Sequence, residues 1–424
     1  MPDAAATTTI FMPRLSDSME EGTIVAWLKS PGEQFKEGDP LVEVETDKAT
    51  IVYEAERSGV LVDVLVEAGG TALLGAPIAR ASSVTVAVAA PTPTGPAPET
   101  VAVAEPGTML EFRAAVRQAL KDELERDQDV ILFGEDVAIP GGVFALTPGL
   151  HERFGSSRVF DTPISELAMT GAAFGAAVCG RRPVLEIMFG DFLPLSMDSL
   201  LNQASKYWFL SGTSVPLTVF SVVGAGGRFG AIHSQMPAAW FHGITGLKIV
   251  APAFPADAKA LLTEAIRDDN PVLFLAHKRL LSIKGEIDSA VVPIGKAKVV
   301  RAGTDVTIVA AMKSVHDSLR AADELAARGV SAEVIDLRTI RPIDIETLLA
   351  SLTKTNRVVV VEEGPLTGGW AGEVVARLAE EGLGDVEDLW RIATANSPVP
   401  YSPPLEDAFL PSAERIVDEV LTRS

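Results

Sequence analysis

Cysteine is almost absent from this sequence. Its 424 residues include one, Cys179, and a single cysteine excludes a framework of intrachain disulfide bonds. So little cysteine is typical of a reducing compartment, either the cytoplasm or one that resembles the mitochondrial matrix. Cys179 stands among small apolar residues, so we predict that it is an inert part of a core.

Long hydrophobic runs and an excess of positive charge are missing as well. The most apolar run, residues 167–180, is too short to span a bilayer and is followed by Arg181 and Arg182. The N-terminus has no basic region followed by an apolar core, which argues against a secretory signal. The net charge of −21 argues against nucleic acid as a partner and favours basic partner surfaces.

Hydrophobic residues, by contrast, make up 47% of the chain, which supports large cores and an obligate subunit interface. The length predicts about two or three domains. We divide the chain into a first domain at 8–82, a linker at 83–107, and two α/β domains at 108–290 and 291–424. The linker contains prolines at 91, 93, 96 and 98 and shows no periodicity, so we predict a flexible Ala/Pro-rich arm or a passive spacer.

An internal repeat marks the first domain. Its two halves share glycines, a proline and apolar positions at one constant offset. The matched pairs include Gly22 and Gly59, Gly32 and Gly69, Gly38 and Gly75, and Pro40 and Pro77. Two like halves of short strands and glycine turns predict an all-β domain, a flattened β-barrel with quasi-twofold symmetry.

A hairpin joins the two halves. Residues 42–52 read as strand, polar turn and strand, which places Lys48 at the tip. The run Glu-Thr-Asp-Lys-Ala resembles the modification site of lipoyl domains, and this resemblance implies lipoate attached to Lys48 by a lipoate ligase. Biotin carriers share the fold but usually flank the lysine with methionines, whereas Asp47 and Ala49 stand here.

The third segment centres on Asp-Thr-Pro-Ile-Ser-Glu at 161–166, which opens a long run of small residues. Ser165 is a suitable N-cap, so we expect Glu166 in the first turn of a helix. An acid at this position interacts with the helix dipole or, where it is buried beside a heteroaromatic ring, shares a proton with a ring nitrogen.

The run DTPISE resembles the beta subunit of the thiamine-diphosphate-dependent decarboxylating component of 2-oxo acid dehydrogenase complexes. In that family the glutamate, here Glu166, contacts the aminopyrimidine of the cofactor. The runs Gly-Glu-Asp-Val, Gly-Asp-Phe and His-Ser-Gln extend the match. They imply that Glu135 is a second acid near the cofactor, that Phe192 stacks on the pyrimidine, and that His233 positions the oxo substrate and protonates the opened lipoyl disulfide. Without the resemblance, Phe192 would be assigned to core packing.

Some positions depart from the family pattern. Ile232 stands where the family usually has Gln, and Thr245 stands where it has Pro. His242 and Gly243 stand in the reverse of the family's order. These departures concern the substrate pocket and the access of lipoate more than the thiamine chemistry. The family also holds a potassium ion, largely through backbone carbonyls, although a helix end followed by Asn-Pro explains the same run without metal. The matching positions are Leu217, Ala265, Ile266, Asp268 and Asn270.

Half of a cofactor site is missing from the chain. Residues 224–230, GAGGRFG, lack the dinucleotide-binding spacing because Phe229 takes the place of the third glycine. We find no Gly-Asp-Gly followed by a downstream Asn, the pattern that holds magnesium and diphosphate in thiamine enzymes. The resemblance therefore implies an alpha subunit that supplies this half, in a tetramer of two alpha and two beta chains.

The fourth segment alternates strands and helices, which predicts a mostly parallel sheet. We expect strands at 305–310, 330–336 and 357–361, and a helix capped by Ser314. The run RTIRPID resembles the C-terminal domain of the family, which serves assembly and docking to an acyltransferase core.

The resemblance thus implies three folded parts: an all-β lipoyl domain, an α/β thiamine pyrimidine-binding domain of the transketolase type, and an α/β transketolase C-terminal-like domain. Pyruvate is the expected substrate, with acetoin or a branched-chain 2-oxo acid as alternatives. A non-catalytic lipoyl carrier or assembly subunit is the rival from another class, and Glu166 and His233 argue against it.

Overall fold

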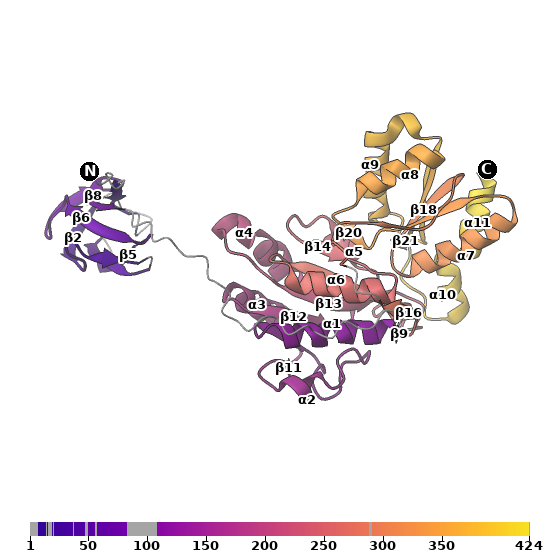
Figure 1. Ribbon diagram of the computed structural model, residues 1–424, viewed down its shortest axis with the longest axis horizontal. Coiled ribbons are helices and arrows are strands. Elements are labelled where there is room, and N and C mark those ends of the chain that lie inside the picture. Colours follow the sequence, from indigo (N-terminus) through magenta and orange to yellow (C-terminus); the bar gives the residue numbers. More distant parts are fainter. Residues whose placement is uncertain are drawn as a thin grey trace. The chain divides into compact units, whose positions relative to one another are not determined.

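The computed structural model forms two compact units, residues Met1–Pro98 and Glu99–Ser424 (Figure 1). The described residues are 7–13, 15, 19, 21–36, 38–46, 50–55, 57–82, 108–287 and 291–423. The predicted linker at 83–107 and the predicted lipoylation site Lys48 lie outside these residues.

The N-terminal unit contains two four-stranded antiparallel sheets. One sheet has the order β1 (Thr7–Phe11), β8 (Pro77–Ser82), β6 (Gly59–Val64) and β3 (Gln34–Phe35). The other has the order β5 (Thr50–Glu54), β4 (Pro40–Glu45), β2 (Glu21–Trp27) and β7 (Thr71–Leu73). The predicted all-β domain is confirmed.

The repeat in the sequence corresponds to a repeat in the sheets. Strands β2, β3 and β4 of the first half match β6, β7 and β8 of the second, and the members of each pair lie in opposite sheets. Gly32 and Gly69 both adopt the left-handed region, with φ of 90° and 88°, which side chains with a Cβ rarely allow. The equivalent residues Ile24 and Leu61 are both fully buried. Each half therefore contributes equivalent residues to the barrel core.

The hairpin between the halves is also present. Strands β4 and β5 pair in antiparallel register up to Glu45 and Thr50, which leaves four residues for the connection. The two strands of the predicted hairpin are therefore present on either side of position 48.

The second unit is built on a seven-stranded sheet. In spatial order its strands are β11 (Val159–Asp161), β10 (Val130–Gly134), β12 (Arg182–Ile187), β13 (Thr218–Val223), β15 (Val272–His277), β14 (Lys248–Val250) and β20 (Thr339–Arg341). All neighbouring strands are parallel except β20, which is antiparallel to β14. Because β20 comes from the C-terminal segment, this segment adds an edge strand to the first sheet.

Helical segments connect these strands. They are α1 (Phe112–Arg126), α2 (Leu150–Phe154), α3 (Glu166–Val178), the 3₁₀ helix η1 (Gly190–Ser196), the π-helical η2 (Ser199–Ala204), α4 (Ser205–Ser211), α5 (Ala238–His242), α6 (Pro255–Arg267) and the 3₁₀ helix η3 (Lys278–Leu280). A two-stranded antiparallel ribbon of β9 (Thr108–Glu111) and β16 (Lys284–Ile287) joins the two ends of this region.

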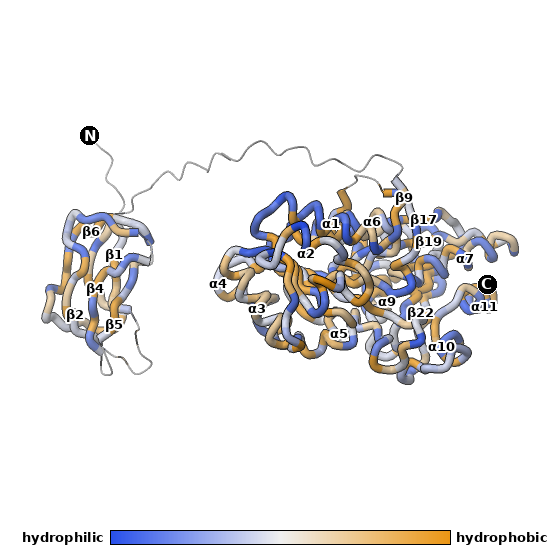
Figure 2. Tube along the Cα trace, turned by 90° about the horizontal axis from the view of Figure 1, so that it is seen from below, coloured by the Kyte–Doolittle hydropathy of each residue, from blue (hydrophilic) through white to orange (hydrophobic). Residues whose placement is uncertain are grey.

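Burial on both faces explains the composition of the central strands. Every residue of β13 and β15 is buried, because helices cover a parallel sheet on both sides. Figure 2 shows the strands at the centre of this unit as mostly hydrophobic. The near-continuous apolar runs of these strands therefore reflect two-sided packing.

The C-terminal segment forms a second, five-stranded sheet. Its order is β17 (Lys298–Arg301), β19 (Ala332–Asp336), β18 (Val306–Ala310), β21 (Arg357–Pro365) and β22 (Asp388–Thr394). The strands are parallel except for β17. The helical segments are α7 (Lys313–Ala327), α8 (Ile345–Thr355), α9 (Ala371–Gly382), η4 (Leu383–Asp385), α10 (Pro403–Phe409) and α11 (Ala413–Thr422). The predicted alternation is confirmed.

Two local predictions were wrong. Cys179 is exposed because it follows the last turn of α3, where the chain leaves the buried face of the helix. Ser314 does not cap α7: the helix begins at Lys313, after Met312, and Ser314 is buried within the first turn.

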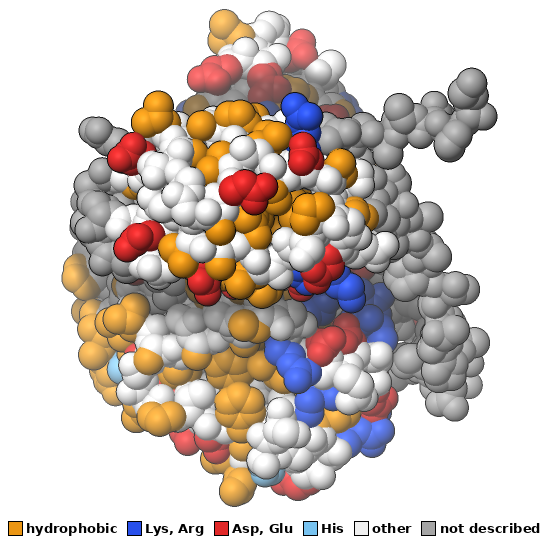
Figure 3. Space-filling model, turned by 90° about the vertical axis from the view of Figure 1, so that its left-hand side faces the viewer, with side chains coloured by type: hydrophobic (Ala, Val, Ile, Leu, Met, Phe, Trp, Pro, Cys, Tyr) orange, Lys and Arg blue, Asp and Glu red, His pale blue; other side chains and the backbone are white. Residues whose placement is uncertain are grey.

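Large apolar side chains are exposed at one end of the second unit. On α4 the exposed fractions of Trp208, Phe209 and Leu210 are 58%, 84% and 73%. On the side that Figure 3 shows, apolar side chains are exposed among charged ones. Within the described residues, no helix has both the length and the apolar character that crossing a membrane requires.

Candidate active site

The predicted site residues follow four neighbouring strands. Glu166 comes after β11, Glu135 after β10, Phe192 after β12 and His233 after β13, and these strands are adjacent and parallel. The carboxyl ends of parallel strands meet at one edge of a sheet, where α/β proteins bind ligands. Consistent with this, the rings of Phe192 and His233 lie 5.5 Å apart, centroid to centroid.

Glu166 is the first residue of α3, and its side chain is buried. Ser165 occupies the N-cap position, but its side chain makes no capping hydrogen bond. The hydroxyl of Thr170 instead lies 2.7 Å from the Glu166 carbonyl oxygen and 2.7 Å from the Ser196 hydroxyl. This contact ties the first turn of α3 to η1, the segment that carries Phe192.

Glu135 shares the electrostatic environment of Glu166. Burial raises the pKa of Glu135, and the negative charges of Glu166 and Asp136 raise it further. Its Oε1 atom is buried and has no hydrogen-bond partner among the described residues. Two buried acids that repel each other favour a shared proton or a bound group that offers one.

Aromatic rings surround His233, and the centre of this cluster escaped the sequence analysis. The Phe189 ring lies 4.8 Å from His233 and 5.7 Å from Phe192, with Phe144 at 5.2 Å and Phe229 at 6.1 Å. The pairs meet edge to face, the arrangement that aromatic quadrupoles prefer. Phe189 ends the apolar run of β12, so the sequence alone suggested only a core residue.

Residues 224–233, which we call the glycine loop, lead from β13 to His233. The Ala225 N–H donates to Glu363 Oε1 at 2.6 Å, and the Gly226 N–H donates to Glu406 Oε1 at 2.9 Å. Both carboxylates come from the C-terminal segment. These two backbone amides, a type of group that can bind a phosphate, are therefore bound to acids of the same chain.

A further buried acid, Glu186 on β12, was not predicted. Its side chain is 1% exposed, and neither carboxyl oxygen has a hydrogen-bond partner within the described part of the chain. Burial raises the pKa of Glu186 to about 8. Near neutral pH this carboxyl is therefore largely protonated. An acid inside an apolar strand run is the signal that could have identified it.

The carbonyls predicted for potassium already accept hydrogen bonds. The Arg182 guanidinium donates to the Ile266 and Asp268 carbonyls, each at 3.2 Å. The Ala265 carbonyl accepts from the Thr218 hydroxyl at 3.0 Å, and the Leu217 carbonyl accepts from the Val272 N–H at 2.9 Å. An ion at this place would compete with Arg182, so potassium stays a prediction.

The positions that depart from the family pattern lie in two places. Ile232 is 69% exposed beside His233. His242 and Thr245 line a cavity of about 820 Å³ together with Trp208 and Arg341, where the two α/β parts meet. The His242 carbonyl accepts a hydrogen bond from Arg341, and burial lowers the pKa of the His242 side chain. None of these contacts joins the His242 side chain to Phe192 or His233.

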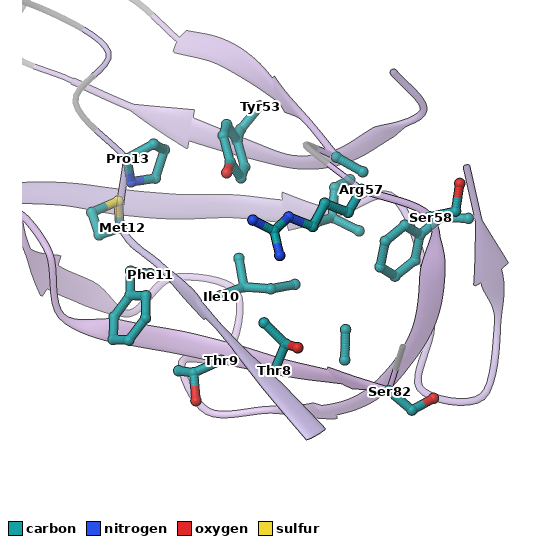
Figure 4. A pocket seen from close by; sticks show the side chains of 14 residues that line it. Thr8, Thr9, Ile10, Phe11, Met12, Pro13, Tyr53, Arg57, Ser58 and Ser82 are labelled. Atoms are coloured by element: carbon teal, nitrogen blue, oxygen red, sulfur yellow. The ribbon is translucent and has the colours of Figure 1, made fainter. Parts of the chain in front are cut away.

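The N-terminal unit has a cavity of its own, of about 410 Å³, between the edge strands β1 and β5. Its walls include the buried side chains of Met12, Phe35 and Leu41. Figure 4 shows the Arg57 side chain extending into it between Tyr53 and Ile10. The cavity is thus a predominantly apolar gap in the side of the barrel with one cationic group.

Three domain families match the chain. Biotin-requiring enzyme matches residues 8–80, the transketolase pyrimidine binding domain matches 108–284, and the transketolase C-terminal domain matches 295–416. A solved structure, a split-gene transketolase in an inactive beta4 tetramer, shares the fold with a TM-score of 0.63 and 22% identity. It covers 74% of this chain and 97% of the transketolase chain.

Curated relatives extend over most or all of the sequence. The pyruvate dehydrogenase E1 component subunit beta of Rhizobium meliloti is 38% identical over 450 residues, 97% of this chain and 98% of that protein. The acetoin:2,6-dichlorophenolindophenol oxidoreductase subunit beta of Cupriavidus necator is 41% identical over 322 residues, 72% of this chain and 95% of that protein. With this coverage and the four strand-end residues in place, the chain belongs to the family of pyruvate dehydrogenase E1 component beta subunits.

Proposed function

We propose that this chain is the beta subunit of a thiamine-diphosphate-dependent 2-oxo acid dehydrogenase that decarboxylates its substrate and reductively acylates lipoate. The observation that carries the proposal is the placement of Glu166, Glu135, Phe192 and His233 at the ends of four adjacent parallel strands. A non-catalytic lipoyl carrier would need no buried pair of acids beside an aromatic cluster.

The residues at these strand ends fit an aminopyrimidine. Glu166 would hold a proton at a ring nitrogen. Glu135 would lie beside Glu166 as the second acid near the ring, and Phe192 would pack on the ring face. Bound thiamine diphosphate supplies a carbon nucleophile that adds to the carbonyl of the oxo acid. The Glu135 Oε1 atom, buried without a partner in the described residues, supports this assignment because a buried acceptor needs a donor.

His233 would act on the acceptor side of the reaction. It would orient the oxo substrate and donate a proton to a sulfur of the dithiolane as the disulfide opens. Its contacts with Phe189 and Phe192 orient the imidazole for this task.

The diphosphate and its magnesium would come with an alpha subunit. The amides of Ala225 and Gly226 are already bound to Glu363 and Glu406, so these two amides of the glycine loop are not available to a diphosphate. Apolar side chains exposed around the site support a subunit interface there. Ile139, Ile164 and Leu167 are 79%, 81% and 55% exposed. By the same family reasoning, two alpha and two beta chains assemble, and the C-terminal domain docks to an acyltransferase core.

The substrate test uses the assembled alpha and beta chains with an artificial electron acceptor. We expect kcat/KM to be highest for pyruvate, compared with acetoin and 3-methyl-2-oxobutanoate. The reason is that the relative spanning 97% of this chain is a pyruvate dehydrogenase subunit. A clearly higher value for either competitor would reassign the substrate. No turnover of any of the three would favour the carrier alternative.

Lipoylation of Lys48 has its own test. A protein made together with a lipoate ligase should gain the mass of one lipoyl group, because position 48 falls in the short connection between the paired strands β4 and β5. Lys48→Ala should gain none, whereas Lys36→Ala, which changes another lysine of the same unit, should be modified normally. An adduct on the Lys48→Ala protein, or biotin on the wild type, would contradict the assignment.

A further inference from the structure

Lys278 lies beside the glycine loop and belongs to none of the motifs quoted above. It follows β15 as the first residue of η3. Its ammonium group donates to the Gly224 carbonyl at 2.9 Å and also to the His233 carbonyl. These two acceptors are the first and last residues of the loop. One side chain therefore joins both ends of the segment that carries His233.

The same ammonium group contacts the aromatic cluster. Its Nζ atom lies 5.2 Å from the centroid of the Phe189 ring and 5.6 Å from that of Phe229, within the range of cation–π attraction. Burial lowers the pKa of Lys278 to about 8, while the negative charges of Asp191, Glu363 and Glu406 act in the opposite direction. The two carbonyls and the rings replace part of the water that this cation loses.

Near His233 the glycine loop is held by Gln235 as well: its backbone N–H donates to Asp191, and its carbonyl accepts from the Gly224 N–H. The rings of Phe189 and Phe192 contact the imidazole itself. Four residues of the loop have left-handed backbone: Gly224, Gly226, Arg228 and Gly230. Glu363 and Glu406 hold its first half, through the amides of Ala225 and Gly226 and the side chain of Arg228. Within the described residues, His233 makes no hydrogen bond other than the one from Lys278.

We propose that Lys278 is a positioning residue for His233: its ammonium group joins the two ends of the glycine loop and sets where the imidazole stands over the site. The proposal rests on the proposed function, because its consequence is acyl transfer to lipoate. It predicts that loss of the ammonium group impairs the step that uses His233 more than the step that uses Glu166.

The test compares Lys278→Met, Lys278→Arg and the control Lys284→Met in the complex with the alpha subunit. Lys284 is an exposed lysine on β16 of the same domain. Hydrogen–deuterium exchange of the peptide 224–235 reports the loop. Two rates report the reaction: turnover of the oxo acid with an artificial acceptor, and acyl transfer to the lipoyl domain.

In Lys278→Met we expect faster exchange in this peptide and acyl transfer reduced about tenfold or more, since hydrogen bonds to a charged group are strong. Turnover with the artificial acceptor should fall clearly less than acyl transfer does. Lys278→Arg, which keeps a charged donor, should recover most of the acyl transfer. Lys284→Met should match the wild type in all three measurements.

Equal loss of both rates in Lys278→Met, or unchanged exchange in the peptide, would overturn the proposal. So would Lys278→Arg behaving like Lys278→Met in all measurements while remaining assembled. The hydrogen–deuterium exchange of the peptide 224–235 can be measured without any turnover. If the wild-type complex turned over no oxo acid, the proposed function would fail, and exchange would still decide whether Lys278 holds the loop.

Discussion

Glu166→Gln is expected to lower the rate of 2-oxo acid decarboxylation by ~10²–10⁴-fold in the complex with the alpha subunit. The substitution keeps the shape of the side chain and removes its ability to exchange a proton with the cofactor ring. The effect should be large because Glu166 is buried and has Glu135 beside it, so water cannot easily replace the carboxylate.

Steady-state turnover with an artificial acceptor measures this effect. The matched control is Glu152→Gln, which changes an exposed acid on α2 of the same domain and should leave turnover within about twofold of the wild type. Near-normal turnover of Glu166→Gln, with the complex assembled, would remove the basis for the thiamine assignment. A loss that appears equally in Glu152→Gln would point to a general defect of assembly.

The second large effect is the dependence of cofactor binding and decarboxylation on the alpha subunit. The purified chain alone should neither bind thiamine diphosphate tightly nor decarboxylate any oxo acid, and addition of the alpha subunit should restore both. A diphosphate needs a metal or a set of free backbone amides with cations. In this chain, the amides of Ala225 and Gly226 are already bound to carboxylates.

Calorimetry with magnesium and thiamine diphosphate measures cofactor binding, first to this chain alone and then to the complex. The subunit interface should bury on the order of 2,000 Å² or more, so that assembly is visible by sedimentation in the same samples. Micromolar binding to the isolated chain at one site per chain would reveal a diphosphate site of its own. Binding that needs the alpha subunit would support a site shared between the subunits.

Local patterns explain most of what could be predicted. The repeat of glycines and apolar residues in 8–82 indicated the two halves of the barrel, because turns and alternation are encoded within a few residues. Ser165 and the small residues after it placed Glu166 at the start of α3. Four short motifs named the residues that now lie at one edge of the sheet.

Contacts between distant residues could not be predicted in this way. Lys278 reaches His233 across 45 positions of the chain, and Glu406 reaches Gly226 across 180. No period or motif links such pairs. The strand β20 likewise gave no sign that it would join the first sheet, because its partner β14 lies far away in the sequence.

The amino-acid sequence by itself therefore determined the folded parts and the chemical types of the site residues, since both follow from patterns that span one element or one turn. Only the tertiary structure decided which side chains meet at the strand ends. It made Phe189 the centre of the aromatic cluster and brought Arg182 to the carbonyls of Ile266 and Asp268. The physical reason is that burial and charge at a site depend on the packing of segments that are far apart in the chain, and this packing is settled only when the sheets form.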